Sequence, residues 1–291
     1  MIHDPFGPEL NTVYIPQLAI LHEHIRHLIF AVTLLHLAHA QPEQSQRFHQ
    51  LATAYQSRAV SNFQSLLSLG QGSTESCYVF SWLLGLHTWA NSRQDRQYGF
   101  GSPSSTIMAL YRVWQQPWGV PDIFKSVHHR YQAPEGSQVL AQDVTDGLGQ
   151  LASCLKGHRT HGRDSVQGQC AHLDVLQGAV RVLRQAFEAF AAESRAREAL
   201  GWLTDSDQGF VDLFETGDRH SRLIVMCFGV LLHHITDDRW WAQDFVKELV
   251  DEMSQMAGKD DQESVSIVAW ARSRVGLDPS PLSILSISRR R

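Results

Sequence analysis

Apolar positions spaced three and four apart run through most of the chain and predict a protein built from helices. Between Pro16 and about Ala40 this spacing places Leu18, Leu21, Ile25, Leu28, Val32 and Leu35 on one helical face. The same period predicts further helices at 42–69, 104–115, 121–132, 137–154, 169–200, 238–257 and 261–275. No segment combines the two-residue alternation of a strand with turn signals on both sides. We therefore expect an all-α, single-domain bundle of roughly ten helices; the two helices described next add the expectation of a central apolar cavity.

Two further helices, 74–90 and 218–235, are apolar nearly all round, which is typical of helices enclosed by others. Ser73 or Thr74 can cap the first of them. Each carries a glycine in its interior, Gly85 or Gly229, and glycine there costs ~1 kcal/mol relative to alanine. Close helix–helix packing explains such glycines, and so does room for a ligand.

A small-molecule pocket between these two helices is the functional hypothesis, because such pockets are mainly apolar with a few convergent polar groups. The aromatic side chains that could form its walls are Phe80, Trp82, Trp89, Trp114, Phe228, Trp240 and Trp241. The expected ligand contacts are Phe80, Ser81, Leu84, Gly85, Thr88, Trp114, Phe228, Gly229, Leu232 and Trp241. The candidate catalytic side chains are Ser81, His87 and His233. The alternative interpretation is that all of these residues are ordinary core.

Chain organisation and charge narrow the class of protein. We expect an N-terminal extension over 1–15, one ligand-binding-like domain over 16–277 and a loose tail over 278–291. A formal charge of −5 gives no net attraction to nucleic acid or an anionic membrane. The longest apolar run, Leu223–Leu232, is about half of what a bilayer requires, and no signal peptide is recognisable. These features predict an intracellular protein without a membrane span. We expect it in the cytoplasm or, if it is a regulator, in the nucleus.

Signatures of common enzyme classes are missing from the sequence. There is no Gly-x-Ser-x-Gly elbow, phosphate-binding glycine loop or complete Gly-x-Gly-x-x-Gly. His22, His24 and His27 fit a histidine-rich helix face better than a metal site, and the aspartate pairs Asp237–Asp238 and Asp260–Asp261 fit helix caps. We therefore expect neither a metal nor a cofactor.

Several short motifs resemble, in order, the fungal-specific transcription factor domain, and most closely its sterol-uptake-control type. They are Phe30–Ala38 followed by Tyr55 and Ala59, Ser76–Phe80, Val113–Val120, Leu223–His233, Trp240–Trp241, and Trp270 with Val275–Leu277. The resemblance covers roughly residues 18–277. It implies an all-α ligand-binding domain with an internal hydrophobic cavity, filled in some members by a sterol.

The chain departs from that family at the DNA-binding head, a zinc cluster that needs six closely spaced cysteines. Only four are present, and they lie far apart: Cys77, Cys154, Cys170 and Cys227. No direct DNA binding is therefore expected. We interpret the cysteines as small apolar side chains buried in the core.

Three hypotheses about function stay open. The first is a cofactor-free cyclase, pericyclase or isomerase acting on a terpenoid, sterol or polyketide in fungal specialised metabolism. The second is a ligand-sensing regulator working through a DNA-binding partner protein, and the third is a non-catalytic binding protein. The expected partner is a hydrophobic small molecule, with a homodimer or a DNA-binding protein as the protein partner.

Overall fold

The fold is all-α, as expected. The computed structural model describes residues 10–91, 102–114, 140–157, 166–193, 202, 206–236, 239–257 and 262–279. Within them lie eleven α-helices and no strand. The chain divides into two compact units: Met1–His129 with Asp238–Phe245 form the first, and Arg130–Asp237 with Val246–Arg291 form the second. The domain bounds at 16–277 stay a prediction.

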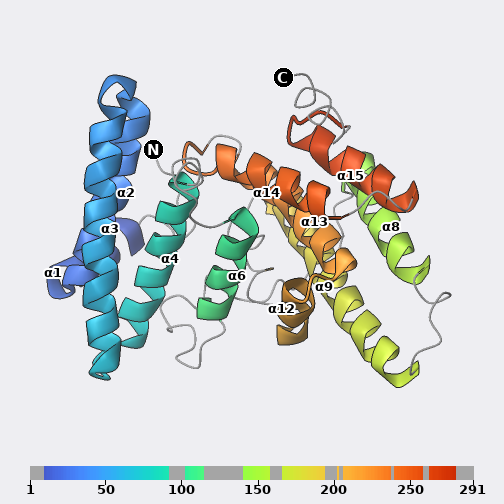
Figure 1. Ribbon diagram of the computed structural model, residues 1–291, viewed down its shortest axis with the longest axis horizontal. Helices are drawn as coiled ribbons and strands as arrows, with labels where there is room; N and C mark the ends of the chain where they lie inside the picture. The colour runs from blue at the N-terminus through green and yellow to red at the C-terminus, as the bar shows by residue number, and fades with distance from the viewer. Residues whose placement is uncertain are drawn as a thin grey trace, which may run out of the picture. The chain divides into compact units, whose positions relative to one another are not determined.

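The first unit is a group of helices that pack against one another. Its helices are α1 (Ile15–Leu21), α2 (Glu23–Ala40), α3 (Ser45–Ser68), α4 (Thr74–Ala90) and α6 (Pro103–Trp114), with a π-helix at Leu10–Tyr14 and a 3-10 turn at Pro42–Gln44. Helix α2 packs against both α3 and α4, and α6 packs against α4 (Figure 1). The buried alanines Ala52 and Ala59 of α3 have short side chains that permit a close helix contact.

The single helix expected from Pro16 to Ala40 is wrong, because the helix is interrupted at His22. This residue has φ −122° and ψ 109°, an extended conformation that separates α1 from α2. The interruption breaks the helical period, so Leu21 is 75% exposed whereas Ile25 is fully buried. Arg26 bridges the break by donating from Nη1 to the backbone oxygen of Ala19 at 3.2 Å.

Helix α4 has the bounds and the cap that its sequence predicts. The Ser73 hydroxyl oxygen accepts from the backbone N–H of Ser76 at 3.2 Å. Ten of the helix's residues are buried: Ser76, Cys77, Tyr78, Val79, Phe80, Ser81, Leu83, Gly85, His87 and Trp89. This burial confirms the interpretation of α4 as a helix enclosed by others.

The second unit is built around α13 (Arg219–Thr236), the other all-round apolar helix. Its remaining helices are α8 (Gln142–Gly157), α9 (Val166–Glu193), α12 (Gln208–Glu215), most of α14 (Gln243–Met256) and α15 (Gln262–Arg274). Helices α8, α9, α12 and α15 all contact α13, and every residue from Leu223 to Leu232 is buried. The apolar period did not predict the eight-residue α12, whose cap is Asp207, accepting from the N–H of Gly209 at 2.7 Å.

Some sequence predictions fall outside the described residues. These are the helix at 121–132, the end of the 169–200 helix, the aspartate pairs proposed as caps, and the tail from residue 280. Cys77, Cys154 and Cys227 are buried free thiols, as expected. None of the described helices is long and apolar enough to cross a membrane.

Candidate functional site: an indole-lined pocket

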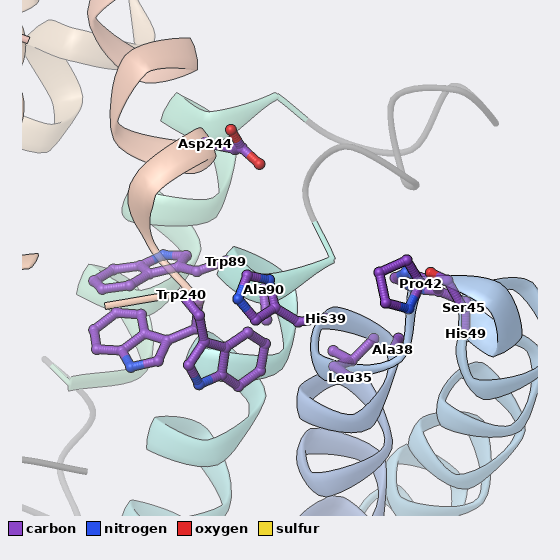
Figure 2. Close-up of a pocket in the computed structure, with 11 residues that line it drawn as sticks. Leu35, Ala38, His39, Pro42, Ser45, His49, Trp89, Ala90, Trp240 and Asp244 are labelled. Atoms are coloured by element: carbon purple, nitrogen blue, oxygen red, sulfur yellow. The ribbon is translucent and has the colours of Figure 1, made fainter. Parts of the chain in front are cut away.

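The first unit contains a pocket of about 330 Å³, which we call the indole pocket (Figure 2). Its lining comes from α2, the 3-10 turn, α3, the end of α4 and the segment that returns at 238–245. The lining residues are Leu35, Ala38, His39, Pro42, Ser45, His49, Trp89, Ala90, Trp240, Trp241 and Asp244. All of them belong to the first unit.

Three tryptophans supply most of the aromatic surface. Trp89, in the last turn of α4, stacks on Trp241 with 5.5 Å between ring centroids and an interplanar angle of 23°. It also stacks on Phe245 at 5.0 Å. Trp240 lies beside α2, with its ring centroid 5.7 Å from that of His39 (Figure 2). Two consecutive tryptophans thus contact two different helices.

The imidazole of His49 is held in place by a buried amide. Its Nδ1 lies 3.0 Å from Oδ1 of Asn91, which is 42 residues away in sequence. Asn91 follows the last residue of α4, and its backbone N–H donates to the His87 oxygen at 3.0 Å. An amide oxygen only accepts, so Nδ1 of His49 is the donor in this contact and Nε2 is not engaged by the amide. In the neutral form of the ring, Nε2 can accept a proton or a hydrogen bond from a guest.

His87, a candidate catalytic residue, lies close to this pair but does not line the pocket. It is only 4% exposed. Burial, with a smaller contribution from nearby His49, lowers the pKa of His87 to about 4, so its ring is neutral at pH 7. Its Nε2 has no hydrogen-bond partner among the described residues. Its catalytic role stays a prediction.

Other predicted contact residues of α4 serve the core of the first unit. Phe80 stacks on Phe63 with 4.0 Å between ring centroids. The hydroxyls of Ser81 and Thr88 donate to backbone oxygens one turn earlier in their own helix, at 2.7 and 2.8 Å. Leu84 packs against the same apolar cluster. None of these four predicted residues lines the indole pocket.

Of the ten predicted contacts, Trp241 is the one that lines the indole pocket. Gly85 is buried within α4. Trp114 is the last residue of α6, and its side chain lies outside the described part of the structure. The catalytic candidate His233 is half-buried in the second unit, with its ring centroid 6.2 Å from that of His234.

The predicted contacts on α13 are packed inside the second unit. Phe228 stacks on Trp202 with 4.4 Å between ring centroids, and Leu232 is fully buried. A Cβ added to Gly229 would lie 2.7 Å from Cγ2 of Val250. Close helix packing, the first of the two explanations, therefore accounts for Gly229. A cavity between α4 and α13, which belong to different units, stays a prediction.

Sequence reasoning named the three indoles as candidate walls but missed the polar lining. His39, His49 and Asp244 stand in three separate elements, and none belongs to a recognisable motif. The start of α2 is richer in histidine but does not line the pocket. There, His24 is buried with its ring near Phe80, and the described residues contain no group of three side chains able to hold a metal ion.

Comparison with models of known families, with curated proteins and with solved structures finds no match for this chain. The resemblance to a fungal transcription factor domain therefore stays a prediction. The geometry of the indole pocket is the basis for assigning a function.

Proposed function

We propose that the protein binds a compact, largely apolar small molecule in the indole pocket and acts on it without a cofactor. The reaction class is a cyclisation, a pericyclic rearrangement or an isomerisation of a terpenoid-, sterol- or polyketide-like molecule. The observation that carries the proposal is a pocket with three indole walls and one imidazole fixed by a buried amide.

The size and lining of the pocket support binding. Small-molecule sites occupy about 300–1,000 Å³ and combine apolar and aromatic walls with a few polar groups. The indole pocket, at about 330 Å³, lies at the small end of that range. Seven of its eleven lining residues are Leu, Ala, Pro or Trp. A compact guest is favoured over an extended one.

Two effects support catalysis. Aromatic walls that hold one conformer of a flexible guest bring its reacting atoms together, which lowers the entropic part of the barrier. A positioned general base adds a factor of roughly 10²–10⁴ where a proton is transferred. His49 is the side chain placed to accept that proton, because Asn91 engages its other ring nitrogen.

The first experiment measures binding. The purified full chain is titrated with N-phenyl-1-naphthylamine, a neutral probe whose fluorescence rises in apolar surroundings. We expect saturable binding that weakens in Trp240→Leu and is retained in Gln64→Ala, an exposed position of α3 that does not line the pocket. Absence of saturable binding in folded protein would overturn the proposal.

The second experiment measures turnover. Terpenoid and polyketide precursors are incubated in D₂O with the pure protein, with a chelator and without nucleotide, and products are followed by mass spectrometry. We expect His49→Gln to retain probe binding and to lose roughly 10²-fold or more in rate, whereas Gln64→Ala keeps the rate. Precursors that displace the probe but are recovered unchanged would contradict the enzymatic part alone.

That last outcome would favour a ligand-sensing regulator or a non-catalytic binding protein. The ordered motifs that resemble a ligand-binding regulatory domain support this second candidate. It predicts altered transcription of neighbouring genes when the gene is deleted, and it requires a separate DNA-binding partner.

A further inference from the structure

We infer that one face of the α2–α3 pair is a docking site for an amphipathic helix of a partner protein, with acidic residues beside the apolar stripe of that helix. The face, which we call the outer strip, consists of Phe30, Leu34, Leu37, Phe48, Leu51 and Tyr55. None of these six residues lines the indole pocket, so the inference is independent of the proposed function.

The two helices contribute equally to the outer strip. Helix α3 follows α2 after the short turn at Pro42–Gln44, and the two helices lie side by side (Figure 1). The three members on α2 are spaced by four and three residues, and the three on α3 by three and four. Residues at these spacings share one side of a helix. The ring of Phe30 lies edge-on to the ring of Tyr55, with 5.5 Å between centroids, and this contact joins the two halves of the strip.

The outer strip is accessible although α2 already buries another side in the core. Ile25, Leu28 and Ala31 of α2 are fully buried in the apolar cluster that α2 shares with α4. By contrast, Phe30 is 45% exposed and Leu51 is 39% exposed. Contiguous apolar surface that stays accessible in the folded chain is typical of a protein interaction site.

Two arginines lie along the α3 side of the outer strip. Arg47 and Arg58 are both exposed, and they stand eleven residues apart, which is about three helical turns. They therefore project from the same side of α3, with Leu51 between them in the sequence. Cζ of Arg58 lies 5.8 Å from the centroid of the Tyr55 ring. Tyr and Arg beside apolar side chains are the residue types enriched at the energetic centres of interfaces.

This charge distribution favours an acidic partner. Helix α3 contains no acidic residue. The acidic residues of α2 and the turn are Glu23, the first residue of α2, and Glu43 in the turn, so both stand at the ends of the pair. A second copy of this chain would bring its own Arg47 and Arg58 to the contact, and like charges facing each other oppose association. A helix with Asp or Glu beside its apolar stripe complements both the apolar spacing and the arginines.

An anionic membrane also attracts arginine, but it fits the outer strip less well. Recognition of anionic lipid headgroups takes a cluster of about four to eight Lys or Arg residues. Helix α3 has Arg47 and Arg58 as its basic residues other than histidine. The helical spacing of the apolar side chains gives specificity for a helix and none for a lipid surface.

The test uses three synthetic, fluorescein-labelled helical peptides that differ at two positions. Each has Leu at helical spacing along one side, and beside that stripe two Glu, two Gln or two Lys residues eleven positions apart. The purified full chain is titrated into each peptide, and fluorescence anisotropy measures binding. At low ionic strength we expect the Glu peptide to bind saturably and about tenfold more tightly than the Lys peptide. The difference should shrink in 1 M NaCl, where charges are screened within about 3 Å. Equal affinities, or no saturable binding of the Glu peptide to folded protein, would overturn the inference.

Variants with matched controls locate the contact. Leu51→Gln should weaken binding of the Glu peptide about tenfold, because one apolar side chain is lost from the interface. Val265→Gln makes a comparable change at a 45% exposed position of the second unit and should keep the affinity. The double variant Arg47→Gln/Arg58→Gln should lower the Glu-to-Lys affinity ratio, whereas Arg181→Gln, at an exposed position of the second unit, should keep it. Circular dichroism checks that each variant is folded. Unchanged binding in both strip variants would overturn the inference, because the peptide would then bind elsewhere.

Two further measurements distinguish the other occupants. A dimer of the full chain in light scattering that becomes a monomer in Leu51→Gln would assign the outer strip to a second copy and overturn the inference. So would sedimentation with vesicles of anionic phosphatidylglycerol that is lost in the same variant, because it would assign the strip to a membrane. Binding of the naphthylamine to the indole pocket should be the same in Leu51→Gln and the wild type, so the proposed function stands or falls separately.

Discussion

At the scale of single residues, buried histidines make the stability of the first unit depend on pH. His24 is 2% exposed, and its ring centroid lies 5.5 Å from that of Phe63 and 5.6 Å from that of Phe80. Burial, with a smaller contribution from His22, lowers the pKa of His24 from 6.5 to about 4. Its Nε2 has no hydrogen-bond partner within the described residues. The native state therefore holds this imidazole neutral.

This residue makes stability dependent on pH in one direction. Because the folded-state pKa is below the unfolded one, the contribution is fully present above about pH 6.5 and is lost as pH falls towards 4. At pH 5, protonation of the unfolded chain at this one site costs about 2 kcal/mol. We expect His24→Leu to lose about 2 kcal/mol less than the wild type between pH 7.5 and 5 in urea unfolding.

The exposed His36→Leu on the same helix is the matched control for that comparison. An equal loss of unfolding free energy in His24→Leu and the wild type would show that His24 is not held neutral by the fold.

At the scale of elements, two glycines of the second unit each leave room for a side chain of a neighbouring helix. The Cβ that Gly229 of α13 lacks would lie 2.7 Å from Val250 of α14, and the one that Gly147 of α8 lacks would lie 2.5 Å from the Trp270 ring of α15. The cost of glycine within a helix is offset here by close packing. By contrast, Gly178 of α9 faces open space.

This contrast predicts opposite effects of the same substitution. Gly229→Ala should lower the free energy of unfolding by about 1–3 kcal/mol, because the new methyl overlaps Val250. Gly178→Ala should raise it by up to about 1 kcal/mol, because helix propensity improves without a clash. Both are measured by urea unfolding at pH 7.5.

Adding Val250→Ala tests the cause of the first effect. The double variant should be less destabilised than the sum of its two single changes, because Val250→Ala removes the overlapping methyl group. Strict additivity would mean that the clash lies elsewhere.

At the scale of the whole molecule, the chain leaves the first unit, forms most of the second, and returns to the first at 238–245. The returning segment supplies Trp240, Trp241 and Asp244 to the indole pocket. The pocket is therefore completed by residues about 190–210 positions away from those of α2 and α3. A ligand held there stabilises the arrangement that brings these distant segments together.

We expect binding to be visible as increased stability of the full chain. N-phenyl-1-naphthylamine at 100 times its dissociation constant should add about 2.7 kcal/mol to the free energy of unfolding of the state that binds it. Differential scanning calorimetry should show a higher Tm in the wild type. At the same probe concentration, Trp240→Leu should show a smaller increase, and an equal increase would place the probe outside the indole pocket.

The apolar period predicted most of the helices, because helical hydrogen bonds and the period itself are local. The stretches 74–90 and 218–235 became α4 and α13 with bounds within a residue and with the expected all-round burial. The apolar period did not predict the break at His22, which depends on the backbone conformation of one residue. It also did not predict α12, which has only eight residues.

Which side chains share a pocket became visible only in the folded chain. The tryptophans were visible as candidates, but nothing local pairs His49 with Asn91 or brings Asp244 to the same lining. The same holds for Gly229, where packing against Val250 selected one of two explanations that the sequence left open. The physical reason is that these contacts join residues from 21 to about 200 positions apart, and their proximity depends on how whole helices pack.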